Sequence, residues 1–169
     1  MINLPIQTER LTIRKFTVDD LQPFLSFMLD GESTKFLAFS EEQKTEIGAI
    51  EVFNLVIQSY SSSVPIHSYA IEDQKSHQYI GSCGFADYDK GIVEIYFSIN
   101  KEYCNQGFAT EATKALINSL VNIPNLNEIR AYCHPDNLIA HSVAKKSGML
   151  HRGLALHQHF GMKGELFTA

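Results

Sequence analysis

The residues from Asn105 to Ala112 (N-Q-G-F-A-T-E-A) combine a small turn with the start of a helix. The first N–H groups of a helix have no partner within it and lie at the positive end of its dipole, so they bind phosphate well. Gly107 would let a phosphate approach the main chain without a Cβ in the way, and Thr110 would offer a hydroxyl. On this fragment alone an ordinary turn is the more common explanation, because short motifs match by chance.

The histidines and cysteines predict neither a metal site nor a disulfide framework. Cys83, Cys104 and Cys133 are widely spaced and form no C-x-x-C pair, which is typical of free thiols in a reducing compartment. Cys104 has no histidine beside it in the sequence to activate it as a nucleophile. No two histidines share a helix with a carboxylate at metal-binding spacing, so we expect no metal. His157 and His159 share one face of an expected strand, where a contact with a substrate is an open alternative.

The spacing of apolar residues predicts a mixed α/β chain around these residues. Alternation in the segment 92–99 (I-V-E-I-Y-F-S-I) indicates a half-buried strand with Glu94, Tyr96 and Ser98 on one face. Capping-box patterns at Thr17 and Ser40 predict the starts of two helices. Strands are expected over 10–16, 67–72, 79–86, 92–99 and 128–133, further helices from 109 and 137, and a final hairpin over 151–169.

The composition narrows the classes of function. The chain has 169 residues, with 14 Lys and Arg against 19 Asp and Glu, which gives a net charge of −5. A chain of this length forms one domain with a sufficient core, and its acidic balance argues against a non-specific nucleic-acid binder. No apolar run approaches the ~18 residues of a membrane-spanning helix, and no basic and apolar leader opens the sequence. We therefore expect a cytoplasmic protein that binds neither nucleic acid nor membrane.

Four segments are informative together: T-E-R-L-T-I-R (8–14), Y-I-G-S-C-G-F (79–85), V-E-I-Y-F-S-I-N-K-E-Y-C-N-Q-G-F-A-T-E-A (93–112) and H-P-D-N-L-I-A-H-S-V-A-K-K-S-G-M (134–149). In this order they resemble the Gcn5-related N-acetyltransferases (the GNAT superfamily), and within it the branch of the ribosomal-protein N-terminal acetyltransferases RimJ and RimL. The resemblance implies one acetyltransferase domain over residues 1–169. Its α/β fold would have a central, mostly antiparallel, twisted sheet, a splayed parallel pair of strands and about four flanking helices.

The resemblance also implies the activity and the binding site. Acetyl-CoA would be the co-substrate, and a primary amine would attack it directly in a ternary complex. The family's phosphate motif, [RQ]-x-x-G-x-[GA], falls on residues 104–109. Main-chain N–H groups of 106–110 would bind the pyrophosphate, and the strand around Phe97 would pair with the pantetheine arm, opposite a strand that splays away at Cys133. The expected cofactor-binding residues are Phe97, Ile99, Gln106, Gly107, Phe108, Ala109, Thr110 and Asn137.

Two departures from the family pattern bear on activity. Cys104 stands where the phosphate motif begins with Arg or Gln, and Ala140 stands where a hydroxyl would lie near the leaving sulfur. The tyrosine that other branches use as the general acid has no counterpart, so Ser142 is the nearest candidate acid and solvent is the alternative. These departures favour a second hypothesis, a non-catalytic acyl-CoA-binding or sensor domain on the same fold.

Glu94 is the candidate base. An amine must lose a proton before or during its attack, and a nearby carboxylate can accept it. Glu94 lies in the middle of an expected strand and aligns with the Glu of the family's A-E-I-G-Y segment. The alternative is a solvent-facing glutamate paired with a lysine.

The acceptor is the least determined partner. A small-molecule amine and a peptide N-terminus both fit the resemblance, and a homodimer is an expectation from the family alone. Acidic residues cluster between Asp30 and Glu51, in the region that shapes the acceptor groove of this family. A solvated helix face is the usual explanation of such a cluster, although a basic acceptor would suit it.

Overall fold

The computed structural model describes residues 2–169, whose strands form one eight-stranded sheet in the order β1-β2-β3-β4-β5-β6-β8-β7. Neighbouring strands run antiparallel except β5 and β6, which are parallel. The strands are β1 (Ile6–Gln7), β2 (Leu11–Arg14), β3 (His67–Asp73), β4 (Gln78–Asp89), β5 (Ile92–Ile99), β6 (Glu128–Cys133), β7 (Leu150–Leu156) and β8 (Lys163–Thr168). The helices are α1 (Leu21–Leu29), α2 (Gly31–Thr34), α3 (Glu46–Ser59), α4 (Phe108–Leu120) and α5 (Leu138–Lys146), with 3₁₀ turns η1 (Val18–Asp20) and η2 (Lys101–Tyr103).

The predicted architecture is confirmed, with differences in detail. Strands β5 and β6 have the expected bounds, while β1 and the four-residue helix α2 carried no clear sequence pattern. The second helix starts at Glu46 rather than near Ser40. Ser40 and Gln43 do bond each other, with the Ser40 N–H donating to Gln43 at 2.9 Å. Thr45 nevertheless caps the helix, because its hydroxyl accepts the N–H of Gly48 at 3.1 Å.

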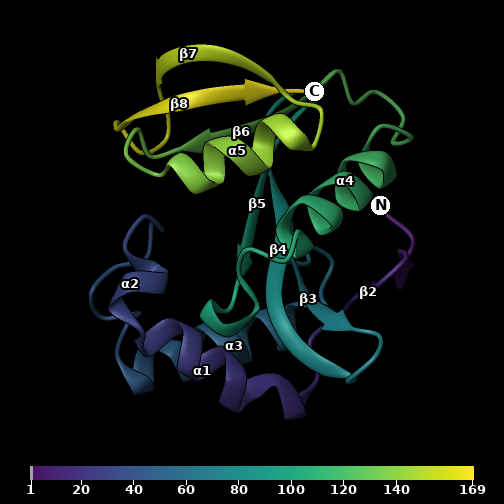
Figure 1. Ribbon diagram of the computed structural model, residues 1–169, viewed down its shortest axis with the longest axis vertical. Coiled ribbons are helices and arrows are strands. Elements are labelled where there is room, and N and C mark those ends of the chain that lie inside the picture. The colour runs from purple at the N-terminus through teal and green to yellow at the C-terminus, as the bar shows by residue number, and fades with distance from the viewer. Residues whose placement is uncertain (1) are drawn as a thin grey trace.

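Two apolar clusters cover the two faces of the sheet. On one face α4 buries Ala112, Leu116 and Leu120 against β5 residues Val93 and Ile95. On the other face α1 and α3 pack an aromatic cluster onto β3 and β4. Figure 1 shows α1, α2 and α3 at one end of the molecule and β6, β7, β8 and α5 at the other, with β5 running between them. The expected alternation of β5 is therefore confirmed, and it leaves the Glu94 face toward the α1–α3 side.

The parallel pair β5 and β6 separates within the sheet. The two strands pair only through Ile92–Glu128, Val93–Ile129 and Glu94–Arg130. Beyond this point β5 stays paired with β4 as far as Ile99, whereas β6 pairs with β8 through Cys133. The expected splay is therefore present, but it starts directly after Arg130 and not at Cys133. The edge of β5 that faces the opening has no strand partner from Ile95 to Ile99 in the described chain.

Among residues 2–169, no helix has the length and apolar character needed to cross a membrane.

Candidate active site

The turn before α4 has the geometry that a phosphate site requires. Gly107 adopts a left-handed conformation with φ +82° and caps the helix that starts at Phe108. A residue with a Cβ is strained there, which explains the glycine. A Cβ at Gly107 would meet only the Arg10 guanidinium, at 3.4 Å, so the main chain is open to a ligand. Within residues 2–169 no side chain caps α4, and its first N–H groups are available to an anion.

A network from the N-terminal segment braces this turn. Arg10 donates from Nη1 to the carbonyl of Gln106 at 2.9 Å and from Nε to Glu111 at 2.7 Å. Its guanidinium also stacks 4.5 Å from the centroid of the Phe108 ring. Thr8 donates its hydroxyl to Glu111 at 2.6 Å. Burial would raise the pKa of Glu111, but the hydrogen bonds from Thr8 and Arg10 outweigh it and lower the pKa. Residues from the motif T-E-R therefore hold the first turn of α4 in place.

The other expected cofactor residues line up around the same opening. The side chain of Phe108 is buried, and the residue begins α4. Ala109 and Thr110 follow in the first turn of α4, and the Thr110 carbonyl accepts the Ser147 hydroxyl at 3.4 Å. Phe97 and Ile99 lie on the part of β5 that has lost its second neighbour. Asn137 caps α5, since its side-chain oxygen accepts the Ala140 N–H at 3.1 Å, and its amide N–H₂ is left for a ligand.

Glu94 is the last β5 residue paired with β6, so its carboxylate lies where the strands part. Its Oε2 is 2.7 Å from Nε2 of His157, a residue 63 positions away that is only 5% exposed. Nδ1 of His157 accepts the N–H groups of His159 and Phe160, both at 3.3 Å. Because Nδ1 accepts, the proton of the neutral ring is assigned to Nε2, which donates it to Glu94. Glu94 is thus paired with a buried histidine and not with a lysine.

Aromatic side chains surround the Glu94–His157 pair. The ring centroids of Tyr132 and Tyr88 lie 4.6 and 5.2 Å from that of His157, and the ring of Phe160 lies 4.5 Å away. The Tyr88 hydroxyl accepts the Gln158 N–H at 3.2 Å, which fixes the loop that carries His157. His157 and His159 lie in this loop between β7 and β8 and not on a strand, so that sequence prediction was wrong. Strand β7 ends at Leu156, where the chain turns.

Ser142 and Cys104 are the candidate acid and the departure from the phosphate motif that the sequence indicates. Ser142 is half-buried on α5, and its hydroxyl forms no hydrogen bond within the described chain. Cys104 is exposed and precedes the turn, with its Sγ 3.6 Å from the carbonyl oxygens of Ile99 and Asn100. Partial desolvation of the sulfur and the charge of Glu102 raise the pKa of Cys104. The thiol therefore stays protonated near neutral pH, which argues against a covalent acetyl-cysteine.

The candidate site combines a turn with an uncapped helix start, an open strand edge and a carboxylate held by His157. Comparison with protein families assigns the chain, because the acetyltransferase (GNAT) domain family matches residues 10–150. The chain belongs to this family. It is an acyltransferase enzyme of the N-acetyltransferase type. Groups of three or more metal-ligating side chains are not found among residues 2–169.

Similar proteins agree with this assignment. The uncharacterized N-acetyltransferase YnaD from Bacillus subtilis is 30% identical over 149 residues, which cover 88% of this chain and 84% of YnaD. A solved GNAT-family acetyltransferase from Bacillus anthracis has a TM-score of 0.79 at 23% identity, with coverage of 97% and 96%. RimL, a ribosomal L7/L12 N-acetyltransferase solved with coenzyme A, has a TM-score of 0.77 at 12% identity, with coverage of 98% and 96%.

Proposed function

We propose that the protein transfers an acetyl group from acetyl-CoA to a primary amine, either a small molecule or a peptide N-terminus, by direct attack in a ternary complex. The observation that carries this proposal is the position of Glu94. It lies at the point where β5 and β6 part, on the strand whose free edge leads to the phosphate turn. We further propose that residues 1–169 form one such domain, that it acts in the cytoplasm, and that it belongs to the RimJ and RimL branch.

The residues present fit acetyl-CoA. The uncapped N–H groups of Gln106 to Thr110 would hold the pyrophosphate, and the left-handed Gly107 leaves room for it. The free edge of β5 at Phe97 and Ile99 would bond the amide groups of the pantetheine arm, as an added strand does. Asn137 would add its side-chain amide from the start of α5. When bound, acetyl-CoA supplies a thioester, whose carbonyl carbon bonds to the amine nitrogen as the carbon–sulfur bond breaks.

Glu94 would accept the proton that the amine loses. Only Oε2 is bonded by His157, so Oε1 is left for the incoming ammonium group or for a bridging water. His157 donates to Glu94 and is itself fixed through Nδ1, so it orients the carboxylate. Ser142, whose hydroxyl is free of other bonds in the described chain, is the proposed donor of the proton that the CoA sulfur takes up, with solvent as the alternative.

Calorimetry with acetyl-CoA tests this proposal first. We expect saturable binding to the parent protein, because the turn is braced in its binding geometry before the ligand arrives. Absence of binding at millimolar acetyl-CoA would contradict the proposal. Binding without release of CoA thiol for any amine would instead support the sensor alternative, which no contact in the structure specifically favours.

A further inference from the structure

A cavity of about 370 Å³ lies between α1, α3 and the sheet. Its walls are mostly apolar side chains of α1, α3 and residues 37–39, with the amide of Gln43 among them. Its floor is formed by the hydroxyl residues Ser68, Ser82, Tyr96 and Ser98. None of the seventeen residues that line it carries a charge. A buried ammonium or carboxylate would therefore find no partner of opposite charge in this cavity.

The cavity and Glu94 lie on the same face of β5. Side chains alternate along a strand, so Glu94, Tyr96 and Ser98 project to one side, at intervals of about 7 Å. Two of these three residues line the cavity, and the third is the proposed base. A molecule whose amine reaches Glu94 can therefore place its neighbouring group in the cavity.

The hydroxyls of the floor bond each other in pairs. The hydroxyls of Ser82 and Ser98 lie 3.1 Å apart and bond each other, and the hydroxyl of Ser68 bonds that of Tyr96. An apolar group can cover this floor without breaking these hydrogen bonds, a loss that would otherwise be costly. An apolar group can therefore contact both the floor and the walls of the cavity.

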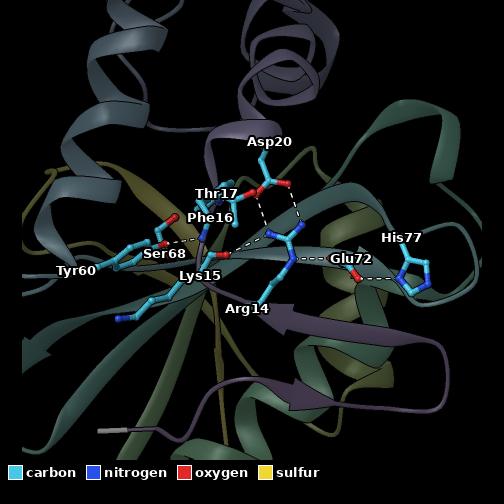
Figure 2. Close-up of polar contacts among 9 residues, drawn as sticks. All are labelled: Arg14, Lys15, Phe16, Thr17, Asp20, Tyr60, Ser68, Glu72 and His77. Atoms are coloured by element: carbon cyan, nitrogen blue, oxygen red, sulfur yellow. Dashed lines mark hydrogen bonds and ion pairs between the residues drawn. The ribbon is translucent and has the colours of Figure 1, made fainter.

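Fixed contacts hold the walls in place, as Figure 2 shows. Arg14 bonds Asp20 through two nitrogens, at 2.7 and 2.9 Å, and bonds Glu72 at 2.5 Å, which ties the start of α1 to strands β2 and β3. At the end of α3, Tyr60 donates its hydroxyl to the Ser68 carbonyl at 2.5 Å and accepts the Phe16 N–H at 3.2 Å. Phe16 and Ser68 both line the cavity. The cavity is therefore formed before any ligand binds.

We propose that this cavity receives the uncharged, apolar group next to the reacting amine, so that the acceptor is a monoamine with an aromatic or branched aliphatic side chain. This inference rests on the proposed function. An arylalkylamine and a peptide with an apolar first residue share this chemistry. The acidic side chains between Asp30 and Glu51 do not line the cavity, so they do not select a basic acceptor there.

Release of CoA thiol from acetyl-CoA with matched amines tests the inference. We expect kcat/KM for 2-phenylethylamine to exceed the values for ethanolamine and spermidine by at least about tenfold, because a fully buried apolar side chain contributes roughly that factor or more. A tripeptide that begins with Phe distinguishes the two sources. Faster turnover of the tripeptide supports a peptide acceptor, and faster turnover of the small amine supports a free amine.

A variant at the rim of the cavity sharpens the test. Leu55 lines the cavity from α3 and is 59% exposed, so Leu55→Glu should fold normally. We expect it to lower the preference for 2-phenylethylamine over spermidine by several-fold, with acetyl-CoA affinity unchanged. Ile47→Glu is the matched control, because Ile47 is 74% exposed on the same helix and does not line the cavity.

Three outcomes would overturn the inference. The first is equal turnover of ethanolamine and 2-phenylethylamine by the parent protein, and the second is a preference of the parent protein for spermidine. Either would overturn the inference and leave the acetyltransferase proposal intact. Acetyl-CoA binding without thiol release for any amine would remove the proposed function, and the inference with it.

Discussion

The phosphate turn and the Glu94 centre lie at the same opening but are specified in different ways. The turn depends on the backbone of a few consecutive residues around Gly107, and contacts from Thr8 and Arg10 then hold it. The carboxylate depends on a single hydrogen bond from His157, 63 residues away on a loop of the C-terminal hairpin. Local sequence can thus define a binding turn, whereas orienting a reacting group requires the completed tertiary structure.

Replacement of Glu94 should have the largest effect on turnover and none on acetyl-CoA binding at the turn. We expect Glu94→Gln to lower kcat about a hundredfold or more, since a positioned base typically contributes that factor. Its affinity for acetyl-CoA, measured by calorimetry, should stay within about twofold of the parent. A variant with unchanged kcat at neutral and mildly acidic pH would contradict the assigned role.

Replacement of Gly107 should act first on acetyl-CoA binding. Gly107→Val forces a β-branched residue to φ +82° and would place a side chain where we propose that the phosphate binds. We expect acetyl-CoA to bind about thirtyfold more weakly, which corresponds to about 2 kcal/mol. Gly153→Val on β7 is the matched control, because it has φ +87° with open space around it. If both variants lose affinity equally, general destabilisation explains the result and the turn is not the binding site.

Replacement of His157 should have an intermediate effect. We expect His157→Leu to lower kcat about tenfold with little change in acetyl-CoA affinity, because Glu94 loses the group that orients it. His157→Gln can still donate a hydrogen bond and should recover part of that loss. The pH profile of kcat should shift in His157→Leu, and an unchanged profile would restrict His157 to a role in stability.

Loss of the Glu111 contacts that brace the turn should have the smallest effect, a change in stability that disappears at acid pH. The pKa of Glu111 lies below its ordinary value of 4.5, so its ionised form stabilises the fold above that pH. This stabilisation is lost as the pH falls through the lowered pKa. We expect Glu111→Gln to have a lower Tm than the parent at pH 7, a loss of about 1 kcal/mol or less in stability. The two Tm values should converge once the pH lies below the lowered pKa of Glu111. A difference that persists there would contradict the ion pair as its cause.

Most of the fold could be predicted from the sequence, and so could the places of Gly107 and Glu94 within the candidate site. Alternation gave the bounds of β5, and the glycine before an alanine-rich helix start indicated the turn, because both signals are local. The predicted start of α3 was wrong because the Ser40–Gln43 pair closes only a turn, whereas Thr45 accepts the Gly48 N–H and caps the helix. His157 could be noticed only as one of two nearby histidines. Its pairing with Glu94 depends on how the β7–β8 loop folds back over the sheet, which has no local signal.

Acetyl transfer to an amine with Glu94 as the base is tested most directly by mass spectrometry. The products are measured after the parent protein is mixed with acetyl-CoA and 2-phenylethylamine. We expect N-acetylated amine and free CoA in equal amounts, with formation of both greatly slowed in Glu94→Gln. Free CoA without acetylated amine, or equal product from the parent and the variant, would contradict this expectation.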